Sequence, residues 1–165
     1  MEKEREERFL ETVRANRERM FRVAMSLLRS GADAEDAVAA AVEATWKGLD
    51  RIRKMEALSA YLMRSTLNAA RSELRKRKRL IPVETVYNAL PAEKEEDTLY
   101  EQICGLEEKY RLVLTMRFGE KMTEQEIADA LRISRGTVST RIRRALKLLK
   151  EEMEKEEGAH AGKRD

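Results

Sequence analysis

The chain has 165 residues, with 34 Lys plus Arg, 31 Asp plus Glu and a formal net charge of +3. Charged residues make up 39% and hydrophobic residues 42%, a balance that excludes a wholly disordered chain. Only seven glycines and two prolines are present and good helix formers dominate, so the composition predicts an all-α protein. A single cysteine, Cys104, and a single histidine, His160, exclude a disulfide framework and a metal site built from several cysteines or histidines.

The sequence also lacks a recognisable membrane signal. The first residues, Met1–Arg5, contain no hydrophobic signal core, and the longest strictly apolar run is the six residues Ala37–Val42. We therefore expect a cytoplasmic protein without membrane insertion.

The charge is unevenly distributed along the chain. Residues 1–80 carry 19 basic and 13 acidic side chains, whereas residues 81–101 carry one basic and six acidic. Residues 102–150 are basic again, with 11 basic side chains against six acidic ones. Two basic blocks around an acidic joint are typical of polyanion binding by the blocks; solvated helix surfaces are the alternative interpretation.

The acidic joint also contains the two prolines, Pro82 and Pro91, which interrupt helices. The sequence therefore predicts two small helical domains joined by an acidic linker. Their expected limits are a first domain at 1–80, a linker at 81–98, a second domain at 99–157 and a tail at 158–165.

Two amphipathic helices are expected at the start of the first domain. Ser30 and Gly31 should end the first helix, and Asp33 is placed to cap the second. The apolar stripe of the second helix consists of Val38, Ala41, Val42, Thr45, Trp46 and Leu49. Such a stripe is typical of packing, so we expect Trp46 in the core, with contact to a partner as the alternative.

The third helix, expected at about residues 57–79, has an unusual polar face. Helical periodicity places one aromatic, one amide and three guanidinium groups in a single stripe, formed by Tyr61, Arg64, Asn68, Arg71 and Arg75. Like charges at these spacings repel one another unless an anion lies between them. A stacking ring, an amide and several cations suit single-stranded nucleic acid, with a solvated helix end as the alternative.

The second domain contains the most specific local pattern. Residues Thr123–Glu126 form a capping box, residues 132–134 a short turn, and Ser134 can cap a longer final helix. This order predicts a helix-turn-helix; an ordinary helical hairpin is the alternative. One side of the final helix carries the apolar residues Val138, Ile142, Ala145, Leu146 and Leu149. The opposite arc carries the donors and cations that a major groove requires, namely Ser139, Thr140, Arg143, Arg144 and Lys147.

No catalytic arrangement is visible in the sequence. A single His and a single Cys cannot form a hydrolytic triad, and no Gly-rich phosphate loop of the Walker type is present. Cys104 is expected to be a buried small apolar residue, with a redox role as the alternative. We therefore expect no enzymatic activity, no catalytic residue and no metal.

In these residues and their spacing, the chain resembles the extracytoplasmic-function group of bacterial sigma factors, the minimal two-domain members of the sigma-70 family. The resemblance rests in the first domain on the runs Asp33–Val38, Trp46–Arg53 and Tyr61–Arg64 with Asn68. In the second domain it rests on the runs Glu108–Arg111, Glu126–Ala128, Gly136–Val138 and Arg144–Ala145.

The resemblance implies core RNA polymerase and promoter DNA as partners, and an anti-sigma factor as a regulator. Because Ala39–Ala41 replaces the Gln-Glu-Thr-like run common in the family, polymerase binding is expected at flanking positions, Asp36, Glu43, Trp46, Lys47 and Asp50. The single-strand set of the third helix then corresponds to the melted downstream promoter element. Contacts to the upstream element are expected from Arg135, Ser139, Thr140, Arg143, Arg144 and Lys147.

The expected function is that of a sigma factor that directs core RNA polymerase to specific promoters. The alternative is a stand-alone helix-turn-helix regulator whose first domain dimerises or senses a signal, and a weaker one is a helical protein-binding adaptor. Repressors of this type bind duplex DNA unaided as dimers, whereas an initiation subunit requires polymerase.

Overall fold

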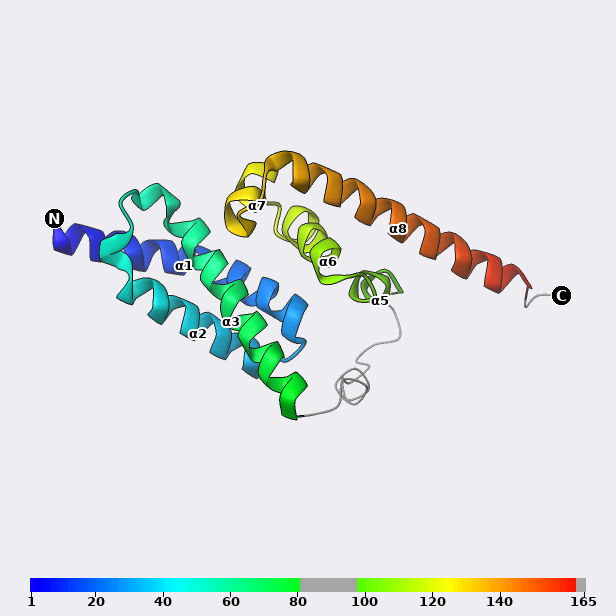
Figure 1. Ribbon diagram of the computed structural model, residues 1–165, viewed down its shortest axis with the longest axis horizontal. Coiled ribbons are helices and arrows are strands. Elements are labelled where there is room, and N and C mark those ends of the chain that lie inside the picture. The colour runs from blue at the N-terminus through cyan, green and yellow to red at the C-terminus, as the bar shows by residue number, and fades with distance from the viewer. Residues whose placement is uncertain (81–97, 163–165) are drawn as a thin grey trace. The chain divides into compact units, whose positions relative to one another are not determined.

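The computed structural model describes residues 1–80 and 98–162 (Figure 1). Within these ranges every regular element is a helix, which confirms the all-α prediction. The chain divides into an N-terminal and a C-terminal compact unit. The predicted linker, residues 81–98, lies outside the described residues except for Thr98.

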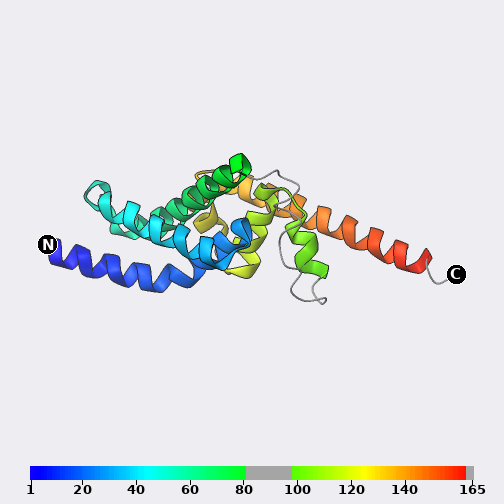
Figure 2. The same cartoon turned by 90° about the horizontal axis from the view of Figure 1, so that it is seen from below.

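The N-terminal unit contains three long helices. They are α1 (Glu2–Leu28), α2 (Gly31–Lys47) and α3 (Leu58–Leu80), with short 3-10 turns at Leu49–Arg51 and Met55–Ala57. α3 packs against both α1 and α2 more extensively than these two pack against each other (Figures 1 and 2). The core between them is filled by fully buried side chains, among them Met20, Val23, Leu28, Leu58, Leu62 and Leu67.

The junction between α1 and α2 differs from the sequence prediction. α1 ends at Leu28, and Arg29 adopts the left-handed conformation, with φ 54° and ψ 24°. Ser30 rather than Asp33 caps α2, because its hydroxyl accepts the backbone N–H of Asp33 at 3.4 Å. The predicted Asp33 cap is therefore wrong, and Gly31 begins α2 instead of ending α1.

Two arginines connect segments of the N-terminal unit that are distant in sequence. Arg77 on α3 donates to the backbone oxygen of Leu28 at 2.8 Å and forms an ion pair with Asp33. Arg5 on α1 donates to the backbone oxygens of Leu49 and Ile52, at 2.8 and 3.0 Å. These guanidinium groups satisfy carbonyls at helix ends, so Arg77 has a structural role within the cationic end of α3.

The C-terminal unit is a helix-turn-helix with two preceding helices. Its elements are α5 (Thr98–Cys104), α6 (Glu108–Leu114), a π-helical turn (Thr115–Gly119), α7 (Glu124–Leu131) and α8 (Arg135–Gly162). α6 packs against α8, and the buried cluster between them contains Tyr110, Leu114, Ala145 and Leu149. α8 continues as a helix through residues 158–162 of the predicted tail.

The local signals of the helix-turn-helix are confirmed. The hydroxyl of Thr123 accepts the N–H of Glu126 at 3.1 Å, which forms the capping box, and the hydroxyl of Ser134 accepts the N–H of Thr137 at 3.1 Å. Arg132 takes the left-handed conformation that ends α7, with φ 55°. Leu146, expected on the apolar side of α8, is 44% exposed, because the neighbouring Ala145 occupies the centre of the buried face.

The contacts of Arg77 indicate that this side chain contributes to the free energy of unfolding. Its side chain is 18% exposed and holds the end of α1 and the start of α2 together. Replacing Arg77 with Met leaves the Leu28 carbonyl and the Asp33 carboxylate without this partner, so we expect the free energy of unfolding to fall by about 1 to 3 kcal/mol. Lys76→Met is the matched control, because Lys76 is exposed and its change should stay within about 0.5 kcal/mol.

Urea unfolding followed by the fluorescence of Trp46, the chain's single tryptophan, reports on this unit. Equal small losses for both variants would show that Arg77 does not hold the α1–α2 junction.

Candidate functional site

The first candidate surface is the exposed face at the start of α8. Val138, Ile142 and Ala145 are buried on the opposite side of the helix. The structure brings the six predicted upstream-promoter residues together on the other side. Ser139 is partly buried, and the exposed members are Arg135, Thr140, Arg143, Arg144 and Lys147. Four cations and two hydroxyls thus share one stretch of helix, as major-groove recognition requires.

Hydrogen bonds fix both hydroxyls of this surface. Ser139 donates its proton to the carboxylate of Glu124 on α7, with an Oγ–Oε2 distance of 2.6 Å. Thr140 donates to the backbone oxygen of Gly136 at 3.0 Å. The guanidinium Nε of Arg135 lies 3.8 Å from the same Glu124 carboxylate. In the sequence, Glu124 stands out only as part of the capping-box segment. The signal for its second role is the helix-turn-helix itself, which brings the start of α7 beside the first turns of α8.

The second candidate surface is the polar stripe of α3. Asn68 and Arg75 are exposed, whereas Tyr61, Arg64 and Arg71 are partly buried. The guanidinium carbon of Arg64 lies 5.0 Å from the centre of the Tyr61 ring, a cation–π distance. One face of this ring is therefore already occupied by a cation.

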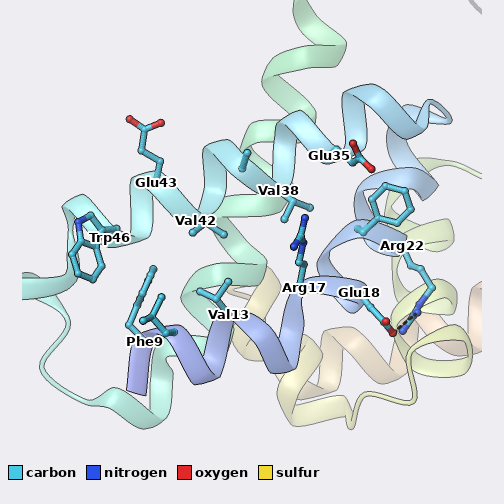
Figure 3. A pocket seen from close by; sticks show the side chains of 13 residues that line it. Phe9, Val13, Arg17, Glu18, Arg22, Glu35, Val38, Val42, Glu43 and Trp46 are labelled. Carbon is cyan, nitrogen blue, oxygen red and sulfur yellow. Dashed lines mark ion pairs between the residues drawn. The ribbon is translucent and has the colours of Figure 1, made fainter. Parts of the chain in front are cut away.

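The third candidate surface is an apolar groove between α1 and α2, of about 900 Å³ (Figure 3). Phe9 and Val13 from α1 face Val38, Val42 and Trp46 from α2 (Figure 3). The rings of Phe9 and Trp46 have centroids 5.1 Å apart and planes inclined by 57°. Charged side chains border the groove, namely Arg17, Glu18, Arg22, Glu35 and Glu43. An open apolar groove with a polar rim is typical of a protein-binding surface.

Only part of the predicted polymerase-binding set lines this groove. Glu43 and Trp46 do, whereas Asp36 and Asp50 are exposed outside it. Trp46 is 43% exposed, so the expectation that it lies in the core is wrong. Phe9 packs against its ring, but the part of the side chain that lines the groove remains exposed to solvent. Leu10, which is 49% exposed and lines the groove, was missed, although an apolar residue beside the Phe9 stripe could have indicated it.

Lys47 lies beside the groove and is held by Glu43. Its ammonium is 2.8 Å from the Glu43 carboxylate, one helical turn away. This hydrogen bond, reinforced by the charge of Lys47, lowers the pKa of Glu43, and the same contact raises the pKa of Lys47. Both groups are fully charged near neutral pH, so the rim keeps one positive and one negative charge side by side.

In the described part of the chain, no group of three or more His, Cys, Asp or Glu side chains is arranged to hold a metal ion. None of the helices in residues 1–80 and 98–162 combines the length and apolar character needed to cross a membrane.

A helix-turn-helix with a cationic outer face, preceded by a helical unit with a cationic helix and an apolar groove, defines a DNA-binding transcription protein. Family models identify both parts: Sigma-70 region 2 matches residues 12–80, and Sigma-70, region 4 matches residues 103–151.

Curated relatives agree over most of the chain. It is 32% identical over 152 residues to an RNA polymerase sigma-E factor of Streptomyces avermitilis, covering 88% of this chain and 85% of the relative. It is 30% identical over 143 residues to RNA polymerase sigma factor SigV of Bacillus subtilis, covering 83% and 86%. Among solved structures, it matches the sigma factor RpoE of Bartonella quintana, solved with the anti-sigma factor NepR. That match has a TM-score of 0.68 and 20% identity, covers 88% and 96% of the two chains, and indicates a shared fold.

The chain therefore belongs to the sigma-70 family, in its extracytoplasmic-function group. Its function is that of the family: it directs RNA polymerase to promoters for transcription initiation.

The open position of Trp46 is testable in the free protein. Because Trp46 is 43% exposed, we expect the emission maximum of its indole to be red-shifted and acrylamide to quench it readily. Phe9→Leu, which shortens the side chain that covers one side of the indole, should increase the quenching further. A blue-shifted emission resistant to acrylamide would show that Trp46 is buried and that the groove is closed in solution.

Proposed function

We propose that the N-terminal unit docks on core RNA polymerase through the α1–α2 groove and holds the opened DNA strand on α3, while α8 reads the upstream promoter duplex. The observation that carries this proposal is the outer face of α8. Four cations and two hydroxyls lie together there, and the apolar residues of the opposite side are buried. The proposed domain limits are 1–80 for polymerase and downstream DNA, and 99–157 for upstream DNA.

The proposed polymerase-binding surface is centred on Trp46 and Glu43, with Asp36, Lys47 and Asp50 around it. The groove offers apolar area that water contacts in the free protein, so a partner helix that covers it gains free energy from burial. The charged rim would fix the orientation of that helix, since rim charges contribute more to specificity than to affinity.

The proposed single-strand surface consists of the α3 stripe, Tyr61, Arg64, Asn68, Arg71 and Arg75. Asn68 is exposed and can bond to the edge of an unpaired base, and Arg75 is exposed for phosphate contact. Because Arg64 lies over the Tyr61 ring, a base would stack on the other face of the ring or on the guanidinium itself.

The proposal includes no chemistry carried out by this chain, since the polymerase makes the RNA. It places the protein in the cytoplasm with the polymerase and the chromosome. An anti-sigma factor is the proposed regulator, supported by the fold shared with a sigma factor solved in complex with one. The stand-alone regulator remains a different outcome, distinguishable because it would bind duplex DNA without polymerase.

The docking surface is tested by two exposed alanines of the N-terminal unit. Ala39 on α2 lines the groove, whereas Ala15 on α1 does not. Ala39→Glu should weaken binding of the full chain to core RNA polymerase by about tenfold or more, because a charge would be buried against the partner. Ala15→Glu introduces the same charge outside the groove and should change the Kd by less than about threefold. Equal losses for the two variants would show that the groove is not the docking surface.

The recognition face is tested with polymerase bound. If Arg143 or Arg144 makes a bidentate contact to a base, substitution by Ala should cost about 1 to 3 kcal/mol in promoter binding and relax the preference at one base pair. Lys147→Ala should instead weaken binding to all sequences about equally, as expected for a phosphate contact. Selection of promoters from a randomised upstream library measures both effects. A uniform loss for both arginine variants would reduce them to phosphate contacts.

A further inference from the structure

The hydrogen bond between Ser139 and Glu124 has consequences for base recognition. Its Oγ–Oε2 distance of 2.6 Å is that of a charge-assisted bond to a carboxylate. An ionised carboxylate can only accept, so the serine hydroxyl must be the donor. A hydroxyl has a single proton, and Ser139 has therefore committed its only one to α7.

What Ser139 retains for a ligand is its lone pairs. Thr140, its neighbour on the same face, has also committed its proton, to the backbone oxygen of Gly136 at 3.0 Å. The remaining polar groups of the face are cations, which can only donate. The recognition surface is thus divided: the cations of Arg135, Arg143, Arg144 and Lys147 supply donors, and the two hydroxyls supply acceptors.

In the major groove, the hydrogen-bond donors are the amino groups of adenine and cytosine, whereas guanine and thymine present acceptors. We propose that Glu124 is a specificity-determining residue, which holds the Ser139 proton and so makes Ser139 an acceptor for an adenine or cytosine amino group in the upstream promoter element. This inference rests on the proposed entry of α8 into the major groove.

Two features of the site support a role for Glu124 beyond holding α7 against α8. Glu124 is only 31% exposed and is shared with Arg135, whose Nε lies 3.8 Å away, so a neighbouring cation offsets its charge near DNA phosphates. Glu124 also lies outside the capping bonds of α7, which are made by Thr123 and Glu126. Its carboxylate is therefore available to control Ser139.

The experiment uses holoenzyme reconstituted from core RNA polymerase and the full chain, with promoters randomised in the upstream element. The unmodified chain should select adenine or cytosine over guanine or thymine by about fivefold on one strand at the position that Ser139 contacts. Glu124→Gln keeps the size of the side chain and its ability to bond Ser139, but its amide can donate and release the serine proton. We expect the preference at that single position to fall below about twofold.

Ser139→Ala should relax the same position, and Glu154→Gln, which removes one carboxylate from an exposed site on α8, should change none. Urea unfolding of the variants accompanies the selection. If Glu124→Gln loses stability while its base selection is unchanged, the bond between Ser139 and Glu124 has only a structural role, and the inference is overturned.

Two further outcomes separate this inference from the proposed function. Selection of guanine or thymine at the position controlled by Ser139 would overturn the inference alone. The same holds if Ser139→Ala changes nothing while Arg143→Ala and Arg144→Ala each relax the preference at a base pair. No change of selection in any of these variants would overturn the placement of α8 in the major groove as well.

Discussion

Burial of the apolar side of α3 against both α1 and α2 is the constraint on which the N-terminal unit depends. Leu58, Leu62 and Leu67 are almost completely removed from solvent there. A helix of this kind has one apolar stripe, and once that stripe is buried its polar face is left to solvent. The side of the α1–α2 pair that α3 leaves uncovered becomes the groove around Trp46 (Figure 3). One packing arrangement therefore produces both candidate surfaces of this unit.

The smaller C-terminal unit also buries one side of a long helix and exposes the other. α8 buries Ala145 and Leu149 against α6, and the cations Arg135, Arg143, Arg144 and Lys147 stay exposed on it. The capped start of α7 and the left-handed Arg132 fix the angle at which α8 leaves the turn. Since the cations lie on the first turns of α8, the geometry of the turn determines where they are presented.

The sequence predicted what is encoded locally. The capping box, the turn and the periodicity of α8 involve residues within a few positions of one another, so the helix-turn-helix could be derived from them. The exposure of Trp46, the role of Arg77 and the bond from Ser139 to Glu124 depend on how separate helices pack, which periodicity does not specify. The Asp33 cap failed for a different reason, because Ser30 is an equally good acceptor three residues earlier.

Sequence-specific initiation should need both units of the chain acting together with polymerase. The decisive measurement is transcription from a promoter library by purified core RNA polymerase, with and without the full chain, while duplex binding by the chain alone is measured in parallel. We expect promoter-specific transcripts only when both proteins are present, from promoters that share an upstream duplex element and a downstream melted element. Tight, sequence-specific duplex binding by the chain alone, with no initiation when core polymerase is added, would show instead that the chain is a stand-alone regulator.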